Sequence, residues 1–496
     1  MNLWNGVRIG LIVSIATVFF LAQETNTSYG QGAEKFALVA QRSNLVVDEG
    51  VVFEAFTFNG TLPGPLIRVK EGDLVEITVQ NLDGITHGLS IHAANTQTSQ
   101  FVGNIGSGQT KTLTFTAEYP GVYMYHCAPG GHGIMTHTMA GMFGMIVVEP
   151  NAKYELEERL LRPPDIKVYV VQHELYSNGR DFFDGKPLYV MFNGYNYRYV
   201  NEPIVTRPGD YIRFYYLNVG PNLVSTFHAV GGVWNYVYYG GNPENRMNGT
   251  QSVISGPTDS WVVEWMVPAE GPFTLVSHAF GTQAAKGAIG VISSSATAPR
   301  VSEIQSEGPR LPLPTQPKRI VSPFGIGTQD VDWPVRFQSG QPVRVQIVGN
   351  SFYPKIAEVP VGTAVTWINE EVFDLLDGER TGKHDVSYVS GPQGFASPLL
   401  SHADSFRFTF TEPGQYEYKC TVHPYMSGRI VVYESGMATS ADVSTVKGEV
   451  GTLRTDMNSV LSELRVPVYA AVVLGAIGTA AGLASLYRAR TRKVAT

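Results

Sequence analysis

Two cysteines, each accompanied by histidines and a methionine, are the residues of this chain best suited to hold a redox metal. Near the C-terminus the spacing is Cys420-x-x-His423-x-x-Met426, with His384 upstream. A thiolate and two imidazoles bind copper in a trigonal arrangement with a weak axial thioether, which makes a blue-copper (type 1) site. The alternative is a buried structural cysteine beside two surface histidines. Four ligands of these types at this spacing favour a type 1 copper.

The N-terminal cysteine has a similar set of neighbours, with His87 before Cys127 and with His137 and Met142 after it. His132 is a rival to His137, because its spacing from Cys127 also suits a ligand. In the C-terminal set the axial methionine stands two residues before a glycine that opens the closing strand, and Met142 does so here. This match favours His137 and makes His132 a polar loop residue over the site.

A second kind of metal site is indicated by the residue before Cys127, which is His126. Neighbours on a strand point to opposite faces, so His126 faces outward if Cys127 faces a copper inside its own domain. His92 has the opposite parity to His87 and should share the outward side. These two imidazoles supply two of the three ligands of a further site. The C-terminal set has Lys419 before its cysteine, so we expect that domain to hold one copper and to do no chemistry alone.

Strands must position these residues, because helical periodicity is scarce and short alternating segments are separated by Gly, Pro and Asn. A turn glycine, an alternating strand and a closing Asn recur at Gly72–Asn81, Gly209–Asn218 and Gly362–Asn369. A second phrase follows each copy, at Pro120–Cys127, Gly271–His278 and Pro413–Cys420. Recurrence in the same order indicates an internal repeat. We therefore expect an all-β chain of three consecutive sandwich or barrel domains.

The middle copy has lost its own metal ligands, since Ser277 stands in the cysteine position and Ala288 in the methionine position. It nevertheless keeps His228 and His278. Two unrelated core or surface histidines are one interpretation. The other is that a domain without a metal lends its histidines to a site elsewhere, and the outward pair His92 and His126 favours this second interpretation.

The domains are expected at 36–150, 160–295 and 341–434, with a Pro-rich linker over 296–340 that should be stiff and extended. Composition limits the partners. Charged residues make up 16% of the chain, the net charge is -7 and the body has no basic block, which argues against nucleic acid. Two widely separated cysteines exclude a disulfide framework, a zinc ribbon and an iron–sulfur cluster held by this chain alone.

The ends of the chain have the composition of targeting segments. Residues 1–30 are typical of a secretory signal peptide, with an uncleaved anchor as the alternative. The uncharged stretch 466–487 is long enough to cross a bilayer and is followed by basic residues, whereas a buried core helix is the other interpretation. With a Ser/Thr-rich stalk over 435–465, we expect a single-pass protein of the cell membrane whose body is extracytoplasmic.

Over roughly residues 50–295 the chain resembles the copper-containing nitrite reductases. The matching stretches are Asn59–Pro65, His87-x4-His92-Ala93-Ala94, Tyr125–Pro129, His137-x3-Gly141-Met142 and Gly220–His228. The third domain resembles a plastocyanin-like or amicyanin-like cupredoxin. The resemblance implies cupredoxin-like Greek-key β-barrels or sandwiches, and the arrangement looks like the fused forms of ammonia-oxidising archaea.

The resemblance also implies the composition of the active site. His92 and His126 of one subunit and His278 of the next would hold a type 2 copper in a homotrimer, and His228 would act in the proton network. Each chain would carry two type 1 coppers and one type 2 copper. Nitrite would be reduced to nitric oxide with electrons from an external small cupredoxin or cytochrome.

One position departs from the family. Three residues after the first type 1 histidine the family has a proton-delivering aspartate, and here the residue is Ser90. A serine does not ionise at neutral pH, and loss of a general acid can cost a factor of about 10² to 10⁴. Val230, two residues after His228, is smaller than the family's usual isoleucine.

Ser90 keeps a second function open, in which the same architecture acts mainly on hydroxylamine or nitric oxide. A membrane-tethered electron carrier without catalysis is a third possibility, if the histidines at 92, 126 and 278 do not gather. An oxygen-reducing multicopper oxidase needs a trinuclear cluster built from His-x-His pairs, and the sequence has none.

Overall fold

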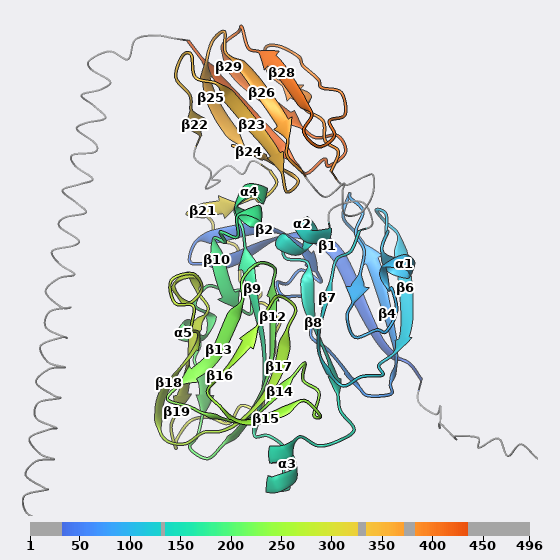
Figure 1. Ribbon diagram of the computed structural model, residues 1–496, viewed down its shortest axis with the longest axis vertical. Helices are drawn as coiled ribbons and strands as arrows, with labels where there is room; N and C mark the ends of the chain where they lie inside the picture. The colour runs from blue at the N-terminus through green and yellow to red at the C-terminus, as the bar shows by residue number, and fades with distance from the viewer. Residues whose placement is uncertain (1–31, 130–133, 326–333, 372–381, 435–496) are drawn as a thin grey trace, which may run out of the picture. The chain divides into compact units, whose positions relative to one another are not determined.

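A computed structural model describes residues 32–129, 134–325, 334–371 and 382–434. The expected signal peptide, stalk and membrane span lie outside these residues, as does the rival ligand His132. Within the described part, no helix combines the length and hydrophobicity needed to cross a bilayer. The described chain is mostly β-structure, and Figure 1 shows its strands in blue, green and orange groups along the chain.

The first unit has two sheets. One has the order β21-β2-β1-β4-β6, made of Arg319–Val321, Val51–Phe58, Glu34–Asp48, Leu74–Asn81 and Thr110–Thr116. The other has the order β3-β8-β7-β5, made of Ile67–Lys70, Phe143–Glu149, Gly121–His126 and Ser90–Ile91. Val75, Ile77 and Val79 of β4 are fully buried while the residues between them are more exposed. This period of two places one face of the sheet in the core.

The second unit also has two sheets. The larger follows the order β10 (Tyr189–Phe192), β9 (Ile166–Leu175), β12 (Tyr211–Gly220), β17 (Ser260–Met266), β14 (Trp234–Tyr239) and β15 (Arg246–Thr250). A further strand, β20 (Glu303–Ile304), pairs with β9. The smaller follows β11-β19-β18-β13-β16, made of Ile204–Thr206, Ile289–Ser294, Gly271–Ser277, Ser225–Val230 and Ser252–Ser255. Phe227, Trp234 and Trp265 pack together in the core of this unit.

The third unit repeats the plan. One sheet follows the order β22 (Val335–Arg336), β25 (Ile356–Pro360), β30 (Ser427–Tyr433), β29 (Gly414–Lys419) and β27 (Ser387–Ser390). The other follows β24 (Ser351–Tyr353), β23 (Val343–Val348), β26 (Ala364–Asn369) and β28 (Ser405–Thr409). Trp367 is fully buried against Phe395, Phe406 and Tyr418.

Helices are short and connect the strands. They are α1 (Ser99–Val102), α2 (Ile134–Met139), α3 (Glu155–Leu160), α4 (Gly179–Phe183), α5 (Arg198–Asn201) and the 3-10 turn η1 (Ala284–Lys286). α2 carries His137 at its C-terminal turn. In the described part of the Pro-rich linker, three short strands join the sheets of the units: β20 pairs with β9, β21 pairs with β2 and β22 pairs with β25, all in parallel.

Candidate metal centres

The first unit brings His87, Cys127 and His137 together in a buried cluster. Cys127 Sγ lies 3.5 Å from His87 Nδ1 and 3.5 Å from His137 Nδ1, and the two ring nitrogens are 3.2 Å apart. His87 comes from an isolated bridge to Ile105, Cys127 follows strand β7, and His137 lies on α2. Met142 is fully buried, and its carbonyl accepts the Cys127 N–H at 2.9 Å.

This geometry fits a trigonal metal ion. Bonds of about 2.0–2.3 Å from a central ion to nitrogen and sulfur would place three ligand atoms about 3.5–4 Å apart. The two distances from Cys127 Sγ, both 3.5 Å, lie at the lower end of this range, and the 3.2 Å between the histidine nitrogens is slightly below it. Burial raises the pKa of the Cys127 thiol, so a thiolate at this depth requires a cation beside it. A copper ion bound between the three donors would meet that requirement.

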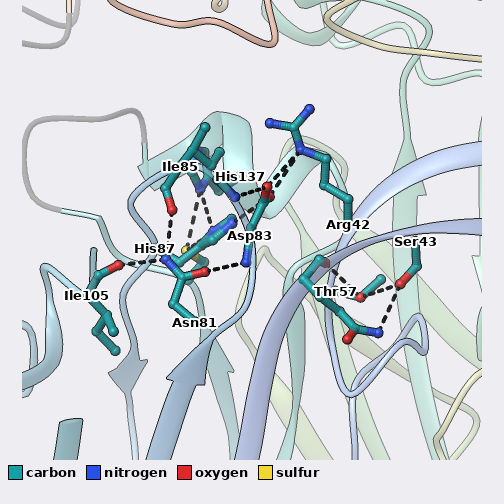
Figure 2. A network of polar contacts seen from close by, with 12 residues as sticks. Arg42, Ser43, Thr57, Asn81, Asp83, Ile85, His87, Ile105 and His137 are labelled. Atoms are coloured by element: carbon teal, nitrogen blue, oxygen red, sulfur yellow. Dashed lines mark hydrogen bonds and ion pairs between the residues drawn. The ribbon is translucent and has the colours of Figure 1, made fainter. Parts of the chain in front are cut away.

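The carboxylate of Asp83 forms a hydrogen bond with the outer ring nitrogen of His87. Figure 2 shows Asp83 between Arg42 and His87, with Asp83 Oδ2 3.0 Å from His87 Nε2 and both carboxylate oxygens 3.1 Å from Arg42 Nε. Burial by itself raises the pKa of Asp83, but the hydrogen bond with His87 and the charge of Arg42 outweigh it, so the pKa is lowered overall. A carboxylate that accepts the outer N–H of a metal-bound histidine fixes its tautomer and orientation. Asp83 belongs to no motif that could have pointed to it in the sequence.

The third unit contains a second cluster of the same kind. Cys420 Sγ lies 3.8 Å from His384 Nδ1 and 3.7 Å from His423 Nδ1, and all three residues are buried. Met426 is fully buried, and its carbonyl accepts the Cys420 N–H at 3.0 Å. Burial raises the pKa of the Cys420 thiol to about 12, so this site also calls for a cation. Both distances from Cys420 Sγ lie within the range expected for a trigonal ion.

His126 and His92 form a separate pair on the other side of strand β7. Their Nε2 atoms are 3.1 Å apart, close to the roughly 3.3 Å between two imidazoles on one tetrahedral metal. His126 Nδ1 donates to the Cys127 carbonyl at 2.8 Å, which leaves its Nε2 lone pair toward His92. Burial, with the neighbouring His92, lowers the pKa of His126 to about 4, and burial also lowers the pKa of His92. Both rings are therefore neutral near pH 7, the form that binds metals.

Ser90 lies on this same face. In the antiparallel pairing of β5 with β7, Ser90 stands directly opposite His126. Directly opposite residues of an antiparallel pair project to the same side of the sheet. The position that the family fills with an aspartate is therefore adjacent to the histidine pair.

His228 and His278 form a second histidine pair, in the second unit. Their ring centroids are 5.1 Å apart, and His228 Nδ1 donates to the Gln251 carbonyl at 2.5 Å. His228 is buried and His278 is exposed. Burial lowers the pKa of His228, and the His278 ring adds to the effect.

A single chain does not unite the two histidine pairs. Among the described residues, clusters of three or more His, Cys, Asp or Glu donors occur only at His87–Cys127–His137 and His384–Cys420–His423. A third ligand for His92 and His126 therefore does not come from the described part of the same chain. The assignments of His278, His228 and Ser90 to a catalytic site stay predictions.

An aromatic contact between the two cysteine sites was also missed. The Tyr425 ring lies 6.0 Å from the His137 ring and 5.9 Å from the His423 ring, measured between centroids. Asn350 Nδ2 donates to the Tyr425 hydroxyl at 3.1 Å and to Thr136 Oγ1 at 3.0 Å. Tyr425 lies inside the Cys420–Met426 motif, so the sequence contained a signal for this residue, but only the fold supplies its partner.

Two family models match the chain. Residues 39–153 match the model described as "Multicopper oxidase", and residues 343–433 match "Copper binding proteins, plastocyanin/azurin family". The second match confirms the expected cupredoxin identity of the third unit.

Several relatives are copper-containing nitrite reductases. The curated enzyme of Neisseria meningitidis serogroup A is 35% identical over 260 residues, which are 49% of this chain and 65% of that protein, so the match spans just under two thirds of its length. The solved nitrite reductase of Thermus scotoductus SA-01 is 54% identical, with a TM-score of 0.78 and coverage of 82% of this chain and 100% of that one. That of Nitrosomonas europaea is 32% identical, with a TM-score of 0.51, and covers 55% of this chain and 98% of its own. The protein therefore belongs to the family of copper-containing nitrite reductases.

Proposed function

We propose that the protein reduces nitrite to nitric oxide, in the balanced reaction NO₂⁻ + e⁻ + 2 H⁺ → NO + H₂O. The observation that carries the proposal is the end of strand β7, where Cys127 belongs to a buried three-donor cluster and His126 faces His92 on the other side. One peptide unit therefore connects a site suited to electron transfer with a site suited to substrate binding. The family membership of the chain supports this assignment.

Copper at these positions would supply one-electron redox chemistry at each cysteine cluster and a Lewis-acidic open position at the imidazole site. His92 and His126 supply two imidazoles to the latter. We assign the third to His278 of a neighbouring subunit, because His278 is exposed and is paired within its own chain with His228. A homotrimer would repeat this contact around a three-fold axis.

His228 is suited to moving a proton at its Nε2 atom. A carbonyl can only accept, so the bond to the Gln251 oxygen fixes the hydrogen of the neutral ring on Nδ1 and leaves Nε2 with a lone pair. Its lowered pKa means that a proton taken up at Nε2 is readily released to a bound oxyanion. The Ser90 hydroxyl, on the same face as His126, can donate a hydrogen bond to that oxyanion but cannot supply the proton of an acid.

We assign an electron-transfer role to the third unit. Tyr425 contacts the rings of His423 and His137, and Asn350 fixes its hydroxyl. The rings of His137, Tyr425 and His423 therefore form a continuous series of aromatic contacts between the two cysteine clusters. We assign to this unit the transfer of electrons from an external small cupredoxin or cytochrome to the first unit. The anchoring of the body outside the cell membrane and the likeness to archaeal fused forms remain parts of this proposal.

Ser90 favours a second candidate, in which the same site acts mainly on hydroxylamine or nitric oxide. A protein loaded with copper and supplied with a reduced donor should release nitric oxide from nitrite, and its copper content should be two type 1 ions and one type 2 ion per chain. Ser90→Asp should raise nitrite turnover if proton supply limits the native protein. Absence of nitric oxide, together with rapid hydroxylamine turnover, would favour the second candidate. If a protein fully loaded with copper shows no type 2 signal, the electron carrier without catalysis is the function that remains.

A further inference from the structure

The three units share a hydrogen-bond pattern that locates the first copper histidine. In each unit an asparagine at or near the end of a strand uses its Nδ2 atom to donate to carbonyl oxygens, two of them for Asn81 and Asn369 and three for Asn218. The first acceptors are Ile85 for Asn81, Gly382 for Asn369 and Leu223 for Asn218. In the first and third units the residue two positions after this acceptor is the copper histidine, His87 or His384. In the second unit that residue is Ser225.

A second pattern locates the other three ligands. In both copper units the cysteine N–H donates to the methionine carbonyl, and the methionine N–H donates to the carbonyl of the second histidine. In the second unit Ser277 N–H donates to the Ala288 carbonyl at 3.0 Å, and Ala288 N–H donates to the Gln283 carbonyl at 3.1 Å. Ser225, Ser277, Gln283 and Ala288 therefore occupy the positions of His, Cys, His and Met.

A buried hydrogen-bond network occupies the space where the metal would lie. Ser277 Oγ donates to Gln283 Oε1 at 2.7 Å and lies 3.1 Å from Ser225 Oγ. Gln172 Nε2 donates to the same Gln283 oxygen at 2.9 Å, and its own Oε1 accepts from Ser225 at 2.8 Å. Tyr216 donates to Ser225 at 2.8 Å. All five residues are at most 2% exposed, so each hydroxyl and amide depends on the others for its partners.

This network adjoins the backbone that carries His278. Ser277 precedes His278, and the His278 N–H donates to the Thr226 carbonyl at 3.1 Å and to Thr226 Oγ1 at 3.0 Å. Thr226 follows Ser225, so the contact between the two serine hydroxyls ties together the ends of β13 and β18 at the point where the imidazole leaves the sheet. Ser277 points into the core and His278 points outward, the alternation seen at Cys127 and His126.

We propose that the second unit contains a former copper pocket whose ligands were replaced by a hydrogen-bond network, and that Ser277 in this network is the positioning residue for His278 at the imidazole site. The proposal rests on the function assigned above. Outer hydrogen-bond partners of a metal site typically change metal affinity by 10–100-fold when removed. The network acts one residue further away, through the backbone of His278, so the lower part of this range is expected.

The test compares Ser277→Ala with Ser294→Ala in the full-length protein. Ser294 lies in the same unit, and its buried hydroxyl has no hydrogen-bond partner among the described residues. Cu²⁺ is titrated against a chelator, and type 2 copper is followed by its electron paramagnetic resonance signal. We expect Ser277→Ala to bind type 2 copper about 10-fold more weakly than Ser294→Ala, with both blue type 1 bands unchanged. Equal type 2 affinity in the two variants would overturn the proposal.

Two further variants keep the test decisive. Ser277→Thr retains the hydroxyl and should bind type 2 copper with native affinity, which keeps the test informative if Ser277→Ala folds poorly. A threonine variant that binds type 2 copper as weakly as the alanine variant overturns the positioning role. The quadruple variant Ser225→His, Ser277→Cys, Gln283→His, Ala288→Met should bind a third blue copper per chain. A folded quadruple variant with no third blue copper refutes the proposal that the second unit contains a former copper pocket. A native protein that binds type 2 copper normally but releases no nitric oxide refutes the proposed function alone.

Discussion

Replacing Asp83 with asparagine should weaken the copper site of the first unit and leave that of the third unit unchanged. Asp83 uses one carboxylate oxygen for His87 Nε2 at 3.0 Å and the other for the Gly84 N–H at 2.6 Å, while Arg42 Nε lies 3.1 Å from both. An asparagine has one oxygen, so its NH₂ group must face either the His87 or the Gly84 N–H. A buried donor then loses its acceptor.

The magnitude follows from which of these contacts are shielded from water. The Asp83 side chain is 6% exposed, whereas that of Arg42 is 49% exposed, so the ion pair contributes only about 0.5 kcal/mol. The hydrogen bond of the carboxylate with His87 is buried and is worth about 1.5–3 kcal/mol. We therefore expect a loss of about 2 kcal/mol, which corresponds to about 30-fold in copper affinity and lies within the usual range for outer partners of metal-bound histidines.

The assay is a chelator titration of the blue absorption band in a Cys420→Ser background, so that only the first unit contributes colour. The same Asp83→Asn change in a Cys127→Ser background reports on the third unit, where His384 Nε2 is buried without a hydrogen-bond partner among the described residues. Because the pKa of Asp83 is lowered in the fold, its contribution is present above about pH 4 and disappears as the pH falls below that value. An affinity within threefold of the native value at pH 7 would refute this reasoning.

Three other predictions follow from named contacts. His126→Ala should abolish the type 2 copper signal and nitric oxide release while both blue bands remain, because it removes one of the two paired imidazoles. Tyr425→Phe should cost about 1 kcal/mol in unfolding free energy through the lost Asn350 bond, and Tyr425→Ala should slow electron transfer between the units in stopped-flow experiments more than Tyr425→Phe does. Burial lowers the pKa of His173 to about 3, so this residue stays neutral in the fold while the unfolded chain takes up a proton below about pH 6.5. The free energy of unfolding should therefore fall by about 1.4 kcal/mol per pH unit as the pH drops from about 6.5. His173→Gln should remove this dependence and flatten the acid limb of the curve of unfolding free energy against pH.

The two cysteine clusters and the outward direction of His126 could be predicted from the sequence, because a strand alternates its faces whatever surrounds it. His137 could be preferred to His132 as a copper ligand only by comparison with the repeated C-terminal set. Asp83 was not predictable, since an acidic residue in a turn has no signature until the fold places it 3.0 Å from His87. The partners of Ser277 were hidden for a different reason. Gln172 and Gln283 are 111 positions apart, and neither residue type indicates a metal site.

If His278 binds the shared metal as proposed, strand alternation explains how a unit with no cysteine cluster of its own can still supply a ligand. In the first unit β7 places Cys127 inward and His126 outward, so the buried cluster and the imidazole pair share one backbone segment. In the second unit β18 keeps the same division, with Ser277 inward and His278 outward. An imidazole that binds a shared metal needs a rigid base, and in the first unit the metal itself can stiffen that base. A unit without a metal must replace this stiffness with protein contacts. Packing alone would leave the inward position free to shift, whereas a closed set of buried hydrogen bonds gives it one favoured geometry.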